Sequence, residues 1–170
     1  PLFIEIQQKF LTAQIRHFGT DHFYGADPFN EIDPPDKSPE YLSQVSKSIY
    51  NGMSNIDPQA VWVQMGWTFY YMKMYREEPA RLKALIEAVP EDKMIILDYF
   101  VEKEEVWRST DAWHGAPYIW CYLGNFGGNT EMAAPIKELS QRILKAENDI
   151  THGKLDGIGS TLEGFGVNRF

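Results

Sequence analysis

The chain has 170 residues, of which 44% are hydrophobic and 24% charged, a balance typical of a globular protein with one core. This composition excludes a disordered or collagen-like chain. Lysine and arginine total 16 against 24 for aspartate and glutamate, so the net charge is −8 and we expect neither nucleic acid nor an anionic lipid surface as partner. No apolar run approaches the roughly 20 residues of a membrane span.

The first part of the chain predicts a helix, a strand and a second helix. Apolar side chains recur at helical spacing over residues 2–18, and Gly19 is placed to end that helix as a C-terminal cap. We expect a strand over residues 22–26. Ser38 followed by Pro39 is typical of a helix start, and apolar positions at helical spacing follow it.

The remainder continues the alternation of strands and helices. Short apolar runs predict the strands and longer amphipathic stretches the helices, whereas residues 101–115 lack clean periodicity and are expected to be irregular. The predicted strands are 61–65, 94–97, 118–123 and a weaker one at 155–158, and the predicted helices are 79–89 and 131–147.

This alternation indicates an α/β fold with parallel strands joined by right-handed crossovers. Five strands fit either a small doubly wound sheet or part of a (β/α)8 TIM-barrel-type domain, whose usual length of about 250 residues exceeds this chain. The length favours the small sheet. The loops favour the barrel, because they carry proline, tryptophan and acids in place of a phosphate-binding Gly-x-Gly-x-x-Gly.

In both architectures functional residues gather beyond the carboxyl ends of the strands. Glu31 follows the first predicted strand and Glu163 the last, so these carboxylates are candidates to face one another across one pocket. A facing carboxylate pair is what glycoside hydrolysis requires. A loop acid is more often solvated or a helix cap, so spacing alone identifies the pair only weakly. Trp67, after the second strand, fits either a core role or a sugar-binding wall.

Several other polar residues have more than one possible role. Asn30 is either a substrate-binding amide or a turn-former, and Asn125 belongs to a glycine-rich segment that forms either a tight turn or a substrate-lining loop. Asp98 ends a strand and is either at the catalytic face or a buried cap. The acidic pair Glu104–Glu105 is expected to be solvated. The four histidines lack ligand spacing, so no metal site is expected.

Several segments together resemble the alpha-N-acetylglucosaminidase family of glycoside hydrolases. The similarity runs in order from about Phe18 to Gly164, nearly the whole chain, and its Gly-Gly-Asn segment is highly specific. The segments that carry it are HFYGADPFNE (22–31), AVWVQMGW (60–67), LDYF (97–100) and YIWCYLGNFGGN (118–129).

The resemblance implies a (β/α)8 barrel of which residues 1–170 form the middle and later part, about five strand-helix units, with the family's flanking domains outside the chain. It assigns Glu31 as acid/base and Glu163 as nucleophile of a retaining exo-hydrolysis of terminal alpha-linked N-acetylglucosamine, and Asn30 and Trp67 as sugar-binding residues. Where relatives commonly read Gly-Met-x-x-Glu-Gly-Ile, this chain reads GSTLEGF over 159–165. The Glu-Gly pair is retained.

The family implies an N-acetylglucosamine-terminated glycan as substrate, no metal or organic cofactor, and a lysosomal, periplasmic or secreted location. Because the chain begins at Pro1 without methionine, we expect a piece of a longer protein, inactive alone until the rest of the parent chain completes the barrel. The lack of an Asn-x-Ser/Thr acceptor favours a bacterial source. The alternatives are a non-catalytic carbohydrate-binding barrel fragment and a flavodoxin-like nucleotide binder, which lacks its phosphate loop here.

Overall fold

Five parallel strands in sequential order form the sheet of this protein. The computed structural model describes residues 2–124, 126, 136–161 and 163. The strands are β1 (Phe23–Gly25), β2 (Val61–Met65), β3 (Met94–Tyr99), β4 (Tyr118–Tyr122) and β5 (Leu155–Ser160), paired in the order β1-β2-β3-β4-β5. A doubly wound sheet reverses its strand order at a switch point, and this sheet does not. The order is that of a partial (β/α) barrel.

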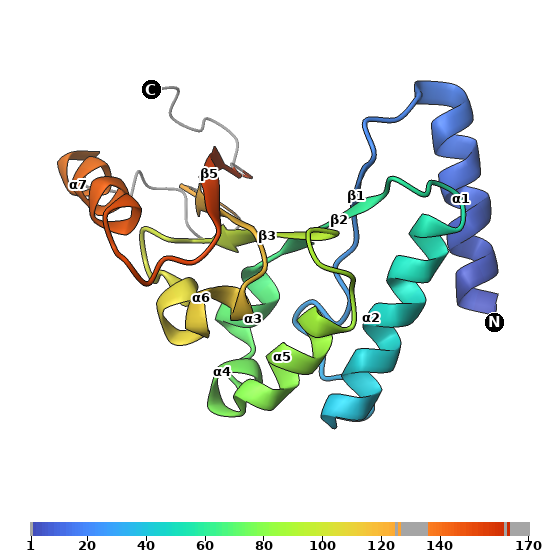
Figure 1. Cartoon of the computed structure of the whole chain (residues 1–170), viewed down its shortest axis with the longest axis horizontal. Helices are drawn as coiled ribbons and strands as arrows, with labels where there is room; N and C mark the ends of the chain where they lie inside the picture. The colour runs from blue at the N-terminus through green and yellow to red at the C-terminus, as the bar shows by residue number, and fades with distance from the viewer. Residues whose placement is uncertain (1, 125, 127–135, 162, 164–170) are drawn as a thin grey trace.

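Helices cover one side of this sheet, where α2, α4, α5 and α6 lie along it, and α1 packs beyond α2 (Figure 1). The helices are α1 (Leu2–Phe18), α2 (Pro39–Ser54), α3 (Trp67–Tyr71), α4 (Met74–Glu77), α5 (Pro79–Glu87), α6 (Asp111–His114) and α7 (Ile136–Glu147), with a 3₁₀ turn, η1 (Val106–Ser109). Among the described residues, no helix is long and apolar enough to cross a membrane.

Local chemistry explains where the long helices begin and end. The Ser38 hydroxyl accepts a hydrogen bond from the Tyr41 amide at 3.3 Å and caps α2, as the Ser38-Pro39 pair predicts. Gly19 adopts φ +77° after α1 and donates its amide to the Ile15 carbonyl at 2.9 Å. Both predicted helix boundaries are therefore confirmed.

The core lies between the sheet and the covering helices. Trp62 and Ile96 alternate with less buried neighbours along their strands, and both belong with the buried Trp120 to this core. The opposite face carries Val63, paired with Ile95, and remains half-exposed. One face of the sheet is thus packed by helices, as on the outside of a barrel.

Short elements depart from the predictions. Helices α3 and α4 were not predicted, and the stretch 101–115 contains η1 and α6 where irregular structure was expected. The first strand is shorter than predicted, and the helix predicted from residue 131 is described only from Ile136. Helices α3, α4 and α6 and the turn η1 have only four or five residues each, too few to show a periodic apolar pattern, so tertiary packing decides their conformation.

Candidate active site

The carboxyl ends of the parallel strands enclose a hollow of about 300 Å³. Both predicted carboxylates, Glu31 and Glu163, line it together with Asn30 and Trp67. The rest of the lining is apolar and consists of Met65, Leu123 and Phe126. Carboxylates with apolar and aromatic walls form a site that suits a small polar ring. The structure thus brings together four of the five predicted site residues, and Asn125 lies outside the described residues.

Glu31 is held in a constrained position beside Trp67. Its backbone adopts φ +55°, a left-handed conformation that non-glycine residues seldom take. The Trp67 indole Nε1 donates a hydrogen bond of 2.6 Å to the Glu31 Oε1 atom. Because Trp67 opens α3 directly after β2, the sheet positions this donor. The Glu31 side chain is exposed and therefore open to a ligand.

The loop that carries Glu31 is fixed by a polar network. Asp27 Oδ1 accepts hydrogen bonds from Gln64 Nε2 at 2.9 Å and from the Thr68 hydroxyl at 3.1 Å. The Thr68 hydroxyl also lies 3.4 Å from Asn30 Oδ1. Burial raises the pKa of the Asp27 carboxyl, whereas the hydrogen bonds from Thr68 and Gln64 lower it. This network ties the β1 loop to β2 and α3.

Glu163 has a single described hydrogen-bond donor from the sheet. The Tyr99 phenol at the end of β3 donates to Glu163 Oε1 at 3.0 Å. Burial, followed by the nearby Glu163 carboxylate, raises the pKa of Tyr99 to about 12, so the phenol remains a donor at neutral pH. The sequence placed Tyr99 at a strand end but assigned it no role, because its partner comes from a segment beyond β5.

A second residue that the sequence did not single out positions the loop after β4. The Glu102 carboxylate accepts the backbone amides of Leu123 at 3.2 Å and Gly124 at 2.8 Å. Burial raises the Glu102 pKa, while these amide hydrogen bonds lower it. Since Leu123 lines the hollow, Glu102 helps to shape the site without entering it.

An aromatic cluster extends the site along its rim. Trp67 contacts Tyr70, Tyr71, Phe100 and Phe126, with ring centroids 5.3 to 6.1 Å apart. Tyr71 is stacked on Trp67 with an angle of 22° between the ring planes. Such a cluster fixes the indole whose N–H reaches Glu31.

Of the two alternatives predicted for Asp98, a place at the catalytic face or a buried cap, the structure shows the buried cap. Its side chain is fully buried, and Oδ2 accepts the Trp107 amide at 3.2 Å at the start of η1. It is a buried cap and lies away from the hollow. Burial raises its pKa well above the usual range, with Glu105 and Glu104 acting in the same direction and the Trp107 and Val106 amides opposing it.

The expectation that Glu104 and Glu105 are both solvated was wrong for Glu105. The Glu105 side chain is only 9% exposed, and its carboxylate accepts the Trp120 indole N–H at 2.8 Å and pairs with Arg108 at 2.8 Å. Glu104 pairs with Arg76. The loop folds back over β4, which two adjacent acids in a sequence do not reveal.

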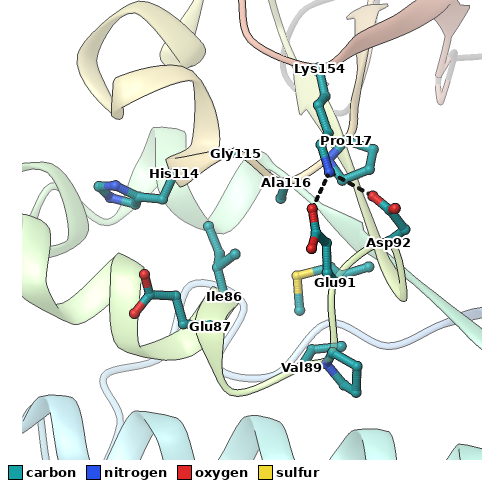
Figure 2. A pocket seen from close by; sticks show the side chains of 12 residues that line it. Ile86, Glu87, Val89, Glu91, Asp92, His114, Gly115, Ala116, Pro117 and Lys154 are labelled. Atoms are coloured by element: carbon teal, nitrogen blue, oxygen red, sulfur yellow. Dashed lines mark hydrogen bonds and ion pairs between the residues drawn. The ribbon is translucent and has the colours of Figure 1, made fainter.

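A larger hollow, about 440 Å³, lies at the opposite edge of the sheet (Figure 2). Lys154 Nζ contacts Glu91 at 3.0 Å and Asp92 at 2.8 Å there, and His114 and Glu87 lie on its other side. Burial lowers the pKa of His114. In parallel barrels this amino-terminal edge serves stability, so the smaller hollow is the candidate active site. Within the described part of the chain, no group of three or more His, Cys, Asp or Glu residues is placed to hold a metal ion.

Comparison with known proteins shows which family this chain belongs to. The sequence matches the family model for the alpha-N-acetylglucosaminidase (NAGLU) tim-barrel domain over residues 1–170. It is 43% identical over 169 residues to human alpha-N-acetylglucosaminidase, covering 99% of this chain and 22% of the relative. The chain thus spans about a fifth of that relative's length.

Solved structures agree with the sequence match. Family 89 glycoside hydrolases from Clostridium perfringens superpose with a TM-score of 0.76 at 28% identity (complex with PUGNAc) and 30% identity (complex with 2-acetamido-1,2-dideoxynojirmycin), covering 98% of this chain and 18% and 17% of theirs. A third, with two glutamates replaced by glutamine, is a complex with GlcNAc-alpha-1,4-galactose, its substrate, again at a TM-score of 0.76, 28% identity and coverage of 98% and 17%.

The chain therefore forms part of a (β/α) barrel of the kind found in family 89 glycoside hydrolases. It belongs to the alpha-N-acetylglucosaminidase family.

Proposed function

We propose that the full-length protein is a retaining exo-glycosidase that releases terminal alpha-linked N-acetylglucosamine. The observation that carries the proposal is that Glu31 and Glu163, far apart in the sequence, line one hollow at the carboxyl edge of the sheet. Support for the substrate comes from the Clostridium perfringens relative, whose doubly Glu→Gln form was seen with GlcNAc-alpha-1,4-galactose. The human relative carries the same activity in its name.

The reaction proceeds in two displacements at the anomeric carbon. In the first, the Glu31 carboxylic acid gives its proton to the glycosidic oxygen while a Glu163 oxygen attacks the anomeric carbon. The bond to the leaving oxygen breaks, the aglycone departs as an alcohol, and a beta-glycosyl ester remains on Glu163. In the second, the Glu31 carboxylate removes a proton from water, which attacks the same carbon and frees the Glu163 carboxylate. Two inversions release the sugar in its alpha configuration.

The neighbouring groups assist both carboxylates. The Tyr99 phenol orients Glu163 and stabilises its negative charge before attack and after release. The Trp67 indole orients Glu31, and its ring supplies one wall of the sugar site. Asn30 lines the same hollow and offers an amide to the sugar hydroxyls. No step calls for a metal or an organic cofactor.

The configuration of the first product tests the double displacement. Proton NMR of a fresh digest of GlcNAc-alpha-1,4-galactose should show the alpha anomer of N-acetylglucosamine first, with the beta anomer growing only by mutarotation. Beta product at the earliest time would indicate a single inverting displacement and overturn the assignment of Glu163 as nucleophile.

A further inference from the structure

We propose that Glu102 is a positioning residue of the candidate active site. As a carboxylate it holds the wall of the hollow at Leu123 through two backbone amides, and when it takes up a proton it releases that wall. The inference rests on the proposed function in one respect, because a looser wall weakens binding only if the hollow holds N-acetylglucosamine. It gives the site a dependence on pH that comes from neither Glu31 nor Glu163.

The Glu102 carboxylate and the loop after β4 make a matched pair of contacts. Glu102 Oε1 accepts the Gly124 amide at 2.8 Å, and Oε2 accepts the Leu123 amide at 3.2 Å. Each carboxylate oxygen thus takes one of two successive N–H groups. Successive amides at a left-handed residue, as Gly124 is with φ +76°, form a concave anion-binding arrangement. The loop therefore binds the charged form of Glu102.

The backbone on which Glu102 sits is fixed independently of these contacts. The amide of Val101, a fully buried residue, donates to the Cys121 carbonyl of β4 at 3.3 Å. Arg142 Nη1 from α7 donates to the Glu102 carbonyl at 2.8 Å. Because the sheet and α7 already hold this backbone in place, the half-buried carboxylate can position the loop.

Leu123 carries the effect to the site. Its side chain is only 1% exposed and lines the hollow beside Glu31. Phe126, slightly farther along the chain, lines the same hollow, and its ring centroid lies 6.0 Å from that of Trp67. The Trp67 indole in turn donates to Glu31. Loss of the carboxylate contacts therefore loosens one wall of the hollow, next to the ring that orients Glu31.

A proton on Glu102 breaks one of the two contacts. Protonation turns one carboxyl oxygen into an O–H donor, which then faces an N–H donor of the loop. Burial raises the pKa of Glu102, while the loop amides and the Arg142 charge lower it. Two further titratable groups lie nearby: Tyr122 on β4, whose pKa is raised by burial and then by the Glu102 charge, and Glu105, which shares Arg142 at 3.9 Å. The raised pKa moves the release above the ordinary range of a glutamate.

Binding of a substrate that cannot be cleaved tests the release. The full-length protein carrying Glu31→Gln and Glu163→Gln would be titrated with GlcNAc-alpha-1,4-galactose by calorimetry, between about pH 4 and about pH 7.5. Neither glutamine nor the disaccharide titrates in this range. We expect Kd to rise by about threefold to tenfold as the pH falls. Adding Glu102→Gln should give the weaker binding at every pH and remove most of this rise.

Asp98→Asn in the same doubly substituted protein is the matched control. Asp98 is also a buried carboxyl that accepts a backbone amide, but it lies away from the hollow. Its substitution should leave the dependence of Kd on pH unchanged. Asp27, whose pKa burial also raises, is present in every protein compared, so its titration does not account for a difference between them.

Amide hydrogen exchange tests the contact itself and needs no variant. In the unsubstituted protein, mass spectrometry of a peptide containing Leu123 and Gly124 gives the protection of these amides relative to their intrinsic exchange rates. We expect this protection to fall by about threefold to tenfold as the pH falls through the pKa of Glu102. The protection of β5 (Leu155–Ser160) should stay the same.

The outcomes separate the inference from the proposed function. A Kd profile that Glu102→Gln leaves unchanged, or protection of Leu123 and Gly124 that does not depend on pH, overturns the positioning role while the glycosidase stands. If the doubly substituted protein does not bind the disaccharide and the unsubstituted protein does not cleave it, the proposed function is overturned. The exchange experiment then still decides whether Glu102 holds the loop.

Discussion

The indole Nε1 of Trp67 and the carboxylate of Glu31 lie 2.6 Å apart, at the ends of neighbouring strands. This contact joins a donor placed by β2 to an acid that follows β1. Because Glu31 also has a left-handed backbone conformation, its side chain depends on such contacts for a defined direction. The relation explains how an exposed carboxylate is positioned for proton transfer.

Trp67→Phe should therefore lower kcat/KM for 4-nitrophenyl alpha-N-acetylglucosaminide by roughly tenfold, since it removes a charge-assisted hydrogen bond and keeps an aromatic wall. The measurement is steady-state kinetics on the full-length protein, beside a thermal unfolding curve that should hardly move because Trp67 is not fully buried. Unchanged kinetics would show that the indole does not position Glu31.

Tyr99→Phe should slow the reaction through Glu163. The substitution removes one hydroxyl that donates to the carboxylate at 3.0 Å and keeps the ring in its buried place. A hydrogen bond to a charged group contributes about 1.5–3 kcal/mol, so kcat/KM should fall by roughly tenfold to a hundredfold. If kcat/KM falls only in proportion to a loss of folded protein, Tyr99 is structural and the positioning role is wrong.

Gly66→Ala should destabilise the protein and disturb the site together. A Cβ at this position would lie 2.3 Å from the Leu97 carbonyl oxygen, which also accepts the Gly66 amide at 2.8 Å. The backbone must move to admit this Cβ, at a cost of about 1–3 kcal/mol in the free energy of unfolding. Because Trp67 is the next residue, the same movement should displace the indole that donates to Glu31. Gly25→Ala meets nothing within 4 Å and is the control. Equal unfolding temperatures for the two variants would contradict the close strand approach.

The pH dependence of the stability of Asp98→Asn tests the raised pKa of the buried Asp98 carboxyl. Burial raises the folded-state pKa of Asp98 above its unfolded value, so folding takes up a proton. The contribution of this group to stability is full below the ordinary aspartate pKa and is lost as pH rises through the folded-state value. Asparagine stays neutral and still accepts the Trp107 amide. The unfolding temperature of Asp98→Asn should therefore rise relative to that of the unsubstituted protein as the pH rises. A difference between the two unfolding temperatures that does not depend on pH would contradict a raised pKa for Asp98.

The long elements of the fold were predictable because each carries its own signal. The run from Val61 to Met65 is apolar apart from Gln64, and Ser38 with Pro39 marks the start of α2. The partial barrel follows from the alternation of such elements and from the family resemblance. Helix α3 has no such signal, because its five residues are ordered by packing against the strands and the aromatic cluster.

Only those site residues that come shortly after a predicted strand could be predicted from the sequence. Glu31, Glu163 and Trp67 were expected at one edge of the sheet, and the structure places all three around one hollow. The contacts of Tyr99 with Glu163 and of Glu102 with the β4 loop depend on chain segments that meet only in the fold. The roles of the two carboxylates remain predictions.

The most direct test is release of 4-nitrophenol from 4-nitrophenyl alpha-N-acetylglucosaminide by the full-length protein, beside its Glu31→Gln and Glu163→Gln variants. The account predicts that the unsubstituted protein cleaves the substrate and that each folded variant loses activity by about 10²-fold to 10⁴-fold. A folded variant that keeps its activity would contradict the assigned roles. An unsubstituted protein that binds the sugar without cleaving it would identify a carbohydrate-binding barrel instead of an enzyme.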